Sequence, residues 1–513
     1  MAVAPFIENE STTSALRADR AARRVSWTDW VQQAPPTRTS GPSGRVLLVS
    51  YLFPPTGGSG VYRPLGLVRD LPRFGWQVEV LTAAHARFPW RDDTLIERVP
   101  QECAVHRVAG HEPACWAHSI AAWCWPPYDP DAPHTTSANS RDQRTRQWID
   151  DRIYWRLARQ TQRLGLDNGE SLWVRPAVRQ AMALHKTSPF DAVISTGPPH
   201  FVHEVGLRFS QHTGVPWLAD LRDPLVSDFD RTAAHAQRDE RMRRLQGRIT
   251  AHARAIITTS ATFAAELAMN RQGATAPRIT CITNGFDREE LQRVGYLVSA
   301  RDWSGCCEFV YAGSCYGRRE VAKLVEPFTA LLKRRPDLRG QFRLTVAGEL
   351  DRQQQDLWRV NREPWLELTG YVSRLDALRR SAEAACNLVV VPDCAHGRSA
   401  IPGKTFDLLA LPRHVLGLAP PRSETAQIIR QAGASSIAPF EDVQSASEAI
   451  EQIIDAFHEQ RLSGDRDWEQ LDKFDRSETA SRVATVLSET AASRVRAQVA
   501  ADKAPTHAQV VLE

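Results

Sequence analysis

The sequence predicts an α/β protein built from two Rossmann-like units, each a parallel β-sheet with helices on both faces. Short apolar runs typical of buried parallel strands alternate with segments that carry apolar residues at helical spacing. The alternation stops near residues 286–305 and then restarts, which divides the chain in two. The 513 residues are too many for one hydrophobic core, and the hydrophobic fraction of 42% is enough for two.

The first unit begins abruptly at Arg45, after a polar N-terminal stretch. Its expected strands cover 46–50, 77–82, 191–195, 216–221, 255–259 and 278–283. Helices are expected over 201–212, 232–253 and 262–270, and also after the first strand, where Leu65, Val68, Leu71 and Phe74 share one face. The rhythm breaks over about 110–187, where a Trp-rich stretch and helical stretches near 141–164 and 171–186 predict an insertion.

The second unit repeats the pattern after the interruption. Its expected strands cover 309–312, 342–347, 365–368, 388–391 and 414–418. Its expected helices cover 320–334, 375–384, 404–411, 424–432 and 443–460, and a last helix is expected over 478–487. We predict a disordered N-terminal extension (1–44), domains over 45–290 and 291–475, a terminal helix over 476–491 and a flexible tail (492–513).

Composition excludes several classes of protein. A net charge of only +4 does not indicate a surface that coats nucleic acid, and the Arg-rich stretch 238–248 suggests a solvated helix face. The nine cysteines lack metal-ligand spacing and suit a reducing cytoplasm. The sequence contains no secretory signal and no apolar run of the ~18 residues that a spanning helix needs. The Asp-x-Asp pairs do not follow apolar strands, so we expect no metal site.

A glycine-rich loop, Phe53–Arg63, joins the first strand to the first helix. Gly58 and Gly60 would leave backbone N–H groups open to an anion, although a tight turn alone could also require glycine. A nicotinamide site would need an acid at the end of the second strand, and that strand ends in Leu81-Thr82. The loop therefore favours a phosphate site of another kind.

Polar residues also follow two later strands of the first unit, where ligands bind in parallel sheets. His200 ends the stretch Ser195–His200 and could orient or deprotonate a substrate group, or could simply pack. Asp220, Arg222 and Asp223 place three charges in four residues. They indicate either a functional site or an internal Arg–Asp pair that holds the loop.

Basic residues mark two turns of the second unit. Gly313 follows a strand and is succeeded by Arg318 and Arg319, whose guanidinium groups suit phosphate. Lys404 opens a helix after Pro402-Gly403, and the alternative is an exposed surface lysine. A glycine loop in one unit and two basic turns in the other predict a diphosphate ligand between two domains.

Seven stretches, in order along residues 45–490, resemble the family-four glycosyltransferases of the GT-B fold, and specifically a bacterial subgroup. They are Val46–Pro55 with Gly57–Gly60, Ser195–His200, Ala219–Pro224, Ile282–Asp287, Tyr311–Ser314, Leu368–Val372 and Ile401–Asp407. The resemblance implies two Rossmann-like domains that face each other across a cleft. It also implies that the terminal helix crosses back to the first domain.

The resemblance further implies a retaining sugar transfer from a UDP- or GDP-type donor, without metal or cofactor. Arg318 or Arg319, with Lys404, would neutralise the leaving diphosphate, while Gly58, Gly60 and Gly313 would line it. The backbone near Val372 would face the base, and Asp407 would reach the ribose. Family members often carry a second acid eight positions earlier, where this chain has Ser399. His200 and Asp223 are our candidates for acceptor-side roles.

The acceptor is left open, and the expected setting is the synthesis of cell-envelope polysaccharide, glycolipid or another glycoconjugate in the cytoplasm. A lipid-linked acceptor would bring peripheral membrane contact, for which the Trp-rich stretch 113–128 is a candidate, with plain packing as the alternative. Two other functions stay open. One is a nucleotide-sugar epimerase on the same fold, and the other is a non-catalytic nucleotide-binding homologue, which Ser399 alone favours.

Overall fold

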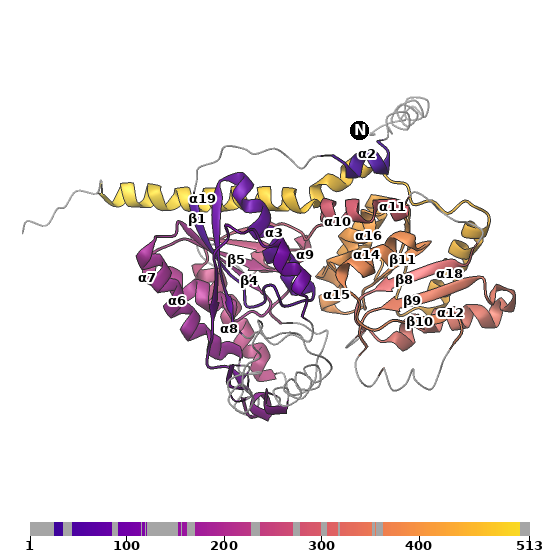
Figure 1. Cartoon of the computed structure of the whole chain (residues 1–513), viewed down its shortest axis with the longest axis horizontal. Helices are drawn as coiled ribbons and strands as arrows, with labels where there is room; N and C mark the ends of the chain where they lie inside the picture. Colours follow the sequence, from indigo (N-terminus) through magenta and orange to yellow (C-terminus); the bar gives the residue numbers. More distant parts are fainter. Residues whose placement is uncertain are drawn as a thin grey trace, which may run out of the picture. The chain divides into compact units, whose positions relative to one another are not determined.

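The computed structural model describes residues 25–33, 44–84, 91–113, 115–117, 120, 152–154, 156–161, 170–226, 236–269, 277–298, 305–315, 319–350, 354 and 363–502. These residues form two compact units (Figure 1). The N-terminal unit takes the described residues of Pro36–Asn284, Cys394–Ile401 and Arg476–Glu513. The C-terminal unit takes those of Met1–Pro35, Gly285–Asp393 and Pro402–Asp475.

The N-terminal unit is built on a parallel sheet of seven strands in the order β3-β2-β1-β4-β5-β6-β7. The strands are β1 (Gly44–Val49), β2 (Trp76–Ala83), β3 (Val105–Val108), β4 (Ala192–Gly197), β5 (Trp217–Leu221), β6 (Ala255–Thr258) and β7 (Arg278–Cys281). The strand order reverses between β1 and β4, and in such sheets ligands bind beyond the carboxyl ends of the strands at this point. We did not expect β3, because its sequence VHRV includes two polar residues.

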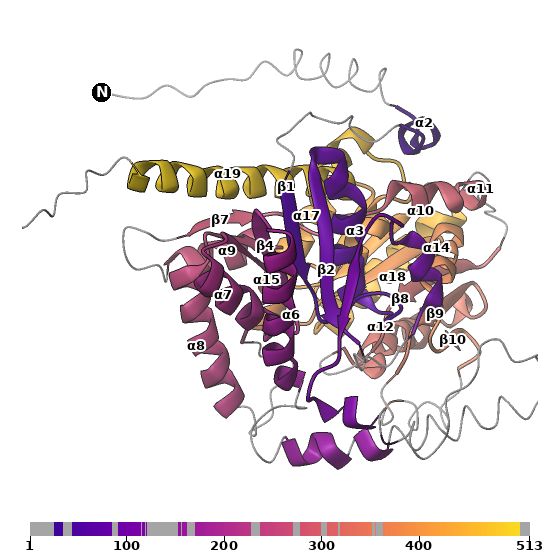
Figure 2. The same ribbon diagram turned by 60° about the vertical axis from the view of Figure 1, so that its left-hand side comes forward.

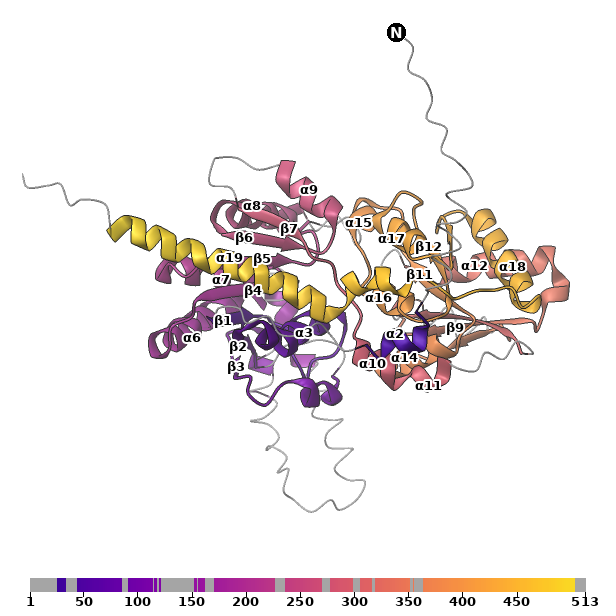
Figure 3. The same cartoon turned by 90° about the horizontal axis from the view of Figure 1, so that it is seen from above.

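Helices cover both faces of this sheet, and the alternation along β1 explains why. Leu47 and Val49 share one buried cluster with α6, α7 and α8, whereas Val46 and Leu48 share another with α3 and α19. Figure 2 shows α6, α7 and α8 together on one side, and Figure 3 shows α19 lying beside α3. The helices are α3 (Tyr62–Asp70), α6 (Val174–Thr187), α7 (Val202–Thr213), α8 (Ala236–His252), α9 (Ala261–Met269), α15 (Ala395–Ser399) and α19 (Arg476–Asp502).

The C-terminal unit repeats this plan with a six-stranded parallel sheet in the order β10-β9-β8-β11-β12-β13. The strands are β8 (Cys307–Ala312), β9 (Phe342–Ala347), β10 (Leu366–Leu368), β11 (Cys386–Val390), β12 (His414–Leu418) and β13 (Ser435–Ala438). The order reverses between β8 and β11, so the equivalent ligand position lies beyond the ends of these two strands. The predicted α/β class with two doubly wound parallel sheets is confirmed.

The helices of the C-terminal unit begin in the stretch where the strand–helix alternation stops. Here lie α10 (Arg288–Arg293), capped by the Asp287 side chain, and α11 (Gly295–Val298). The other helices are α12 (Val321–Arg334), α14 (Arg374–Glu383), α16 (Lys404–Leu409), α17 (Glu424–Ala432) and α18 (Val443–His458). Short 3-10 helices cover Ser59–Val61, Leu71–Phe74, Asp93–Arg98, Glu170–Trp173, Pro336–Leu338 and Trp468–Phe474.

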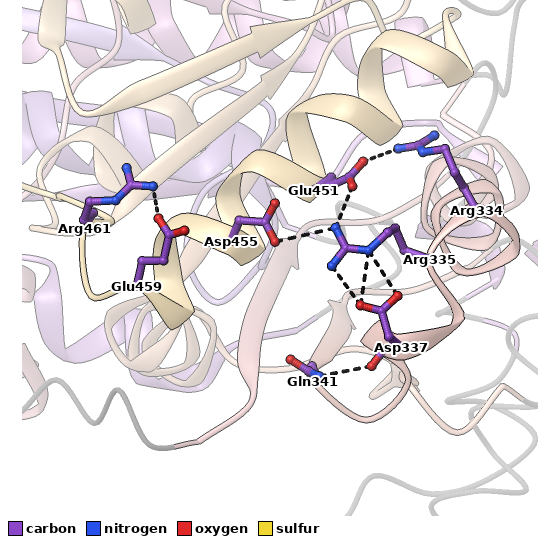
Figure 4. Close-up of polar contacts among 8 residues, drawn as sticks. All are labelled: Arg334, Arg335, Asp337, Gln341, Glu451, Asp455, Glu459 and Arg461. Carbon is purple, nitrogen blue, oxygen red and sulfur yellow. Dashed lines mark hydrogen bonds and ion pairs between the residues drawn. The ribbon is translucent and has the colours of Figure 1, made fainter.

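Charged residues link α12 to α18 at the surface (Figure 4). Arg335 contacts Glu451 on α18 and Asp337 in the following turn, each at 2.8 Å, while Arg334 also pairs with Glu451. Surface pairs of this kind contribute little to stability. The packing of the two helices therefore depends on buried apolar residues such as Phe328 and Ile454.

The N-terminal stretch departs most from our expectation. The prediction of disorder over 1–44 was wrong for residues 25–33, which include helix α2 (Trp27–Val31) with Ser26 as its N-cap. Trp30 is fully buried against Phe286 and Trp468, with ring centroids 5.4 and 5.5 Å apart. The segment was missed because its apolar residues find their partners several hundred positions later in the chain.

Two further observations concern the described residues as a whole. None of their helices combines the length and apolarity that crossing a bilayer requires. The described cysteines are not paired with one another in disulfides. Helix α19 begins at Arg476, where the predicted terminal helix 476–491 begins, but it continues to Asp502, into the stretch predicted as a flexible tail. Its residues Ala480, Val483 and Leu487 are part of the N-terminal unit's buried core.

We predict that Trp30→Ala destabilises the C-terminal unit by about 3–5 kcal/mol, because the change leaves a large cavity among aromatic side chains. Urea or thermal unfolding of the full chain measures the loss. Trp116→Ala is the control, since Trp116 is 43% exposed. Equal stability losses in the two variants would show that α2 is not part of the packed core.

Candidate functional site

Two backbone loops meet at the carboxyl edge of the C-terminal sheet. After β8, the Gly313 N–H donates to the Ala347 carbonyl (2.9 Å), and the Cys315 N–H donates to the Glu349 carbonyl (2.9 Å). A Cβ atom on Gly348 would lie 2.2 Å from the Gly313 oxygen, so only glycine permits this approach. Gly348 escaped the sequence analysis, although its position directly after the strand Phe342–Ala347 was the available signal.

Lys404, the first residue of α16, directs its ammonium group into this edge. The side chain is half-buried overall, but Nζ itself is buried and has no hydrogen-bond partner among the described residues. Nζ lies 3.4 Å from the centroid of the Tyr311 ring. A Cβ on Gly313 would come within 2.7 Å of Nζ, so this glycine makes room for the ammonium. Lys404 is therefore not an exposed surface lysine.

The electrostatics of this position are unusual. Burial, followed by the nearby positive charge of Arg319, lowers the pKa of Lys404 well below its ordinary value. The structure therefore brings together three of the predicted donor-site residues, Gly313, Arg319 and Lys404. Arg318 lies outside the described residues. Two cations at a covered position, one without an acceptor, favour the binding of an anion.

The other predicted donor-site residues of this unit lie nearby in sequence and are differently engaged. Asp407 is buried and accepts a hydrogen bond from Arg374 Nη2 (2.9 Å), and Arg374 Nε also donates to Glu290 (2.7 Å). Val372 is half-buried, just before the N-cap of α14. Arg374 was not predicted as a partner of Asp407, because nothing in the sequence links α14 to α16.

In the N-terminal unit, Arg222 ties the glycine loop to a second loop. Its guanidinium donates to the carbonyls of Gly60, before α3, and Pro198, after β4. Gly58 has a φ of 88°, a conformation that favours glycine, whereas a Cβ on Gly60 would press on Leu52 at 3.2 Å. The two glycines therefore shape a turn that Arg222 holds, which is the structural alternative considered for them.

Of the two aspartates at the end of β5, Asp220 has a structural role and Asp223 has none assigned by its contacts. Asp220 is buried in a bidentate pair with Arg63 (Nε–Oδ2, 2.9 Å) and also accepts from Thr196 Oγ1 (2.7 Å). This is the internal Arg–Asp pair that the sequence left open. Asp223 is half-buried. It lies close enough to Arg222 for its negative charge to favour the protonated guanidinium.

His200, which is half-buried, lies beside the fully buried His203. The rings of His200 and His203 are stacked with centroids 6.0 Å apart. Trp217 Nε1 donates to Ser195 Oγ (2.8 Å), which lies 2.8 Å from His203 Nδ1. Ser195 Oγ thus joins the Trp217 indole to the His203 imidazole, and this hydrogen bond fixes the His203 ring.

Both imidazoles are kept neutral by their surroundings. Burial lowers the pKa of His203 to about 3 and that of His200 well below its usual value, and the charge of Arg222 adds to both effects. His200 Nδ1 is buried without a hydrogen-bond partner in the described structure. His200 thus stays neutral, and its low pKa suits it to hydrogen bonding rather than to accepting a proton.

Glu112, just after β3, is a further residue that the sequence analysis missed. It is fully buried, and burial raises its pKa, although hydrogen bonds from nearby backbone groups and Cys115 act in the opposite direction. Recognising β3 would have drawn attention to it. Of the Trp-rich stretch, Trp116 is described and 43% exposed, whereas Trp123, Trp125 and Tyr128 lie outside the described residues. Within the described residues, no three His, Cys, Asp or Glu side chains are grouped to hold a metal.

Comparison with known proteins gives one sequence match and many structural ones. Residues 57–285 match the family model of the glycosyl transferase 4-like domain. No curated protein matches the sequence. The chain is similar in fold to HepE of Anabaena in complex with UDP and glucose, with a TM-score of 0.56, 11% identity and coverage of 87% of this chain and 100% of that one.

Two other similar structures come from trehalose-phosphate metabolism. One, titled "Trehalose-6-phosphate from E. coli bound with UDP-2-fluoro glucose", has a TM-score of 0.55, 11% identity and coverage of 86% of this chain and 99% of that one. The other is an α,α-trehalose-phosphate synthase (UDP-forming) from Burkholderia xenovorans in complex with glucose-6-phosphate. Its TM-score is 0.54 at 12% identity, covering 86% of this chain and 100% of that one. At these identities the likeness establishes the fold.

We predict that His203 makes the protein less stable in acid. Folded His203 stays neutral down to a pKa of about 3, whereas an unfolded histidine takes up a proton near 6.5. The unfolded state therefore binds more protons between these values, and the free energy of unfolding falls as pH falls from about 6.5 towards 3.

Urea titrations from pH 4.5 to 7.5 test this pH dependence. His203→Gln should flatten the slope by up to ~1.4 kcal/mol per pH unit, because the variant lacks this one titrating group. His212→Gln, on the exposed end of the same helix, controls for the loss of any histidine. An unchanged slope in His203→Gln would contradict the buried, neutral state of His203.

Proposed function

We propose that the protein transfers a sugar from a nucleotide-diphospho-sugar to an acceptor. Residues 57–285 match the family model of the glycosyl transferase 4-like domain, and the fold is that of GT-B glycosyltransferases. The observation that carries the proposal is the buried Lys404 ammonium beside Arg319, without a hydrogen-bond acceptor of its own in the described residues. A diphosphate supplies the negative charge that this arrangement needs.

The proposed catalytic contribution of the C-terminal unit is electrostatic. As the bond to the sugar breaks, negative charge develops on the leaving diphosphate, and fixed cations stabilise it more than they stabilise the bound donor. Lys404 and Arg319 take this role, and Gly313 gives the phosphate access because it has no side chain. Lys404 is held ready by packing on Tyr311, so it need not reorganise during the reaction.

The nucleoside part of the donor is assigned to the adjoining residues. The backbone near Val372 faces the base, and Asp407 takes a ribose hydroxyl. Support for Asp407 comes from Arg374, which orients its carboxylate within a buried pair. We infer a uridine-type donor ahead of a guanosine-type one, because HepE and the E. coli protein are similar in fold and their structures hold UDP or a UDP-sugar.

The proposed role of the N-terminal unit is to bind the acceptor. His200, kept neutral, orients an acceptor hydroxyl, and Asp223 binds nearby. We propose transfer with retention and without a metal ion, the cations of the C-terminal unit supplying the charge that a metal would otherwise bring. The proposed setting is glycoconjugate or polysaccharide synthesis, with a lipid-linked acceptor as one form of the substrate.

We predict that Lys404→Ala lowers kcat by roughly 10²–10³-fold, the loss typical of removing one donor that stabilises transition-state charge. The fold should stay intact, since a buried unpaired ammonium does not stabilise it. Lys333→Ala, an exposed lysine on α12, serves as the matched control. Wild-type turnover in Lys404→Ala would remove this residue from the mechanism.

The donor can be identified by measuring the Tm of the protein in the presence of each member of a panel of nucleotide-sugars. A ligand that binds the folded state raises Tm by mass action. UDP-sugars should raise Tm in the wild type and much less in Lys404→Ala. The panel is repeated with EDTA, which should leave the shift unchanged. Conversion of a donor to its epimer without any acceptor would favour the epimerase, and binding without hydrolysis or transfer would favour a non-catalytic role.

A further inference from the structure

Helix α2 lies against the far end of the helix that carries Lys404. The Trp27 indole Nε1–H donates to the carbonyl of Ala410 at 2.8 Å, and Ala410 caps the C-terminus of α16. That carbonyl is one of the last groups of the helix, which lack partners within the helix itself. The N-terminal segment therefore completes the hydrogen bonding of α16.

A second route leads from α2 to α16 through α10. Gln292 Nε2 donates to the Val31 carbonyl at 2.8 Å, and the Arg288 guanidinium lies 4.4 Å from the Trp30 ring. On the same helix, Glu290 accepts from Arg374, which in turn donates to Asp407 on α16. These contacts thus connect α2 to the same short helix at two positions, its C-cap Ala410 and Asp407 in its middle.

Helix α16 is short enough to depend on such support. It has six residues, and isolated helices of this length are not stable in water. Its first residue is Lys404 and its fourth is Asp407, so a small tilt or fraying of α16 displaces both. Phe406 gives it one further anchor on Phe474, with ring centroids 4.9 Å apart.

We propose that residues 25–33 are a positioning element of the donor site, acting through the Trp27–Ala410 hydrogen bond and the α10 contacts to hold α16 in place. The inference rests on the proposed function, since the site concerned is the one assigned to the nucleotide diphosphate. Trp27 is a positioning residue, because it acts on Lys404 and Asp407 through the helix. The segment lies outside residues 57–285, which match the family model.

The test compares two buried tryptophans of the same unit, each changed to phenylalanine in the full-length protein. Trp27 and Trp365 are both 8% exposed, so both variants remove similar buried area. Trp365 packs against Phe328 and Phe342, and its Nε1 has no hydrogen-bond partner in the described part of the chain. Only Trp27→Phe therefore loses a hydrogen bond to α16.

Two readouts separate positioning from general destabilisation. Hydrogen exchange of the backbone amides of residues 404–410 should become about fivefold faster in Trp27→Phe. This is the effect expected from the loss of roughly one net hydrogen bond. In Trp365→Phe the exchange of these amides should not change. The Kd for UDP should rise by a similar factor in Trp27→Phe alone. Equal exchange rates at α16 in the two variants would overturn the proposal.

The two measurements also separate this inference from the proposed function. Wild-type protein that binds no nucleotide diphosphate would refute the proposed function, while the exchange of α16 would still decide whether α2 holds it. Conversely, normal UDP binding in Trp27→Phe, with a Tm lowered as in Trp365→Phe, would leave the transferase proposal intact and reject the positioning role.

Discussion

The buried ammonium of Lys404 is the constraint on which the candidate site depends. An amine placed beside a guanidinium and away from water costs free energy unless a negative group joins it. Several local features make sense only as ways to keep it there: Gly313 leaves the space it occupies, Tyr311 offers its ring face, and Gly348 lets the β8 and β9 loops touch. A chain selected only for stability would avoid this arrangement, whereas a diphosphate site requires it.

The N-terminal unit solves a different problem, which is to hold several loops rigidly at one sheet edge. Two arginines do this: Arg63 binds Asp220 and the backbone after β7, and Arg222 bridges the loops that follow β1 and β4. In these contacts, residues of the sequence motifs hold the loops in place. They leave His200, neutral and with an unpartnered buried nitrogen in the described residues, as the group best suited to chemistry.

Much of the fold could be predicted because strand and helix periodicity is local. The apolar runs after Arg45 and before Gly313 fall within β1 and β8 as expected. The features that escaped prediction depend on contacts between distant positions. Helix α2 needs Ala410 and Asp472, the role of Asp220 needs Arg63, and the orientation of Asp407 needs Arg374. Sequence reasoning identified Lys404 from its neighbours, but only the structure revealed that its ammonium is buried and without a hydrogen-bond acceptor in the described residues.

The most direct test of this account is calorimetric titration with UDP at several pH values from 7 to 10, each in two buffers of different ionisation enthalpy. A bound diphosphate restores the charge that burial and Arg319 oppose, so it raises the pKa of Lys404 and draws a proton from the buffer. The account predicts proton uptake on binding in the wild type and none in Lys404→Met. Tight UDP binding with no proton uptake, or equal uptake in Lys404→Met, would contradict it.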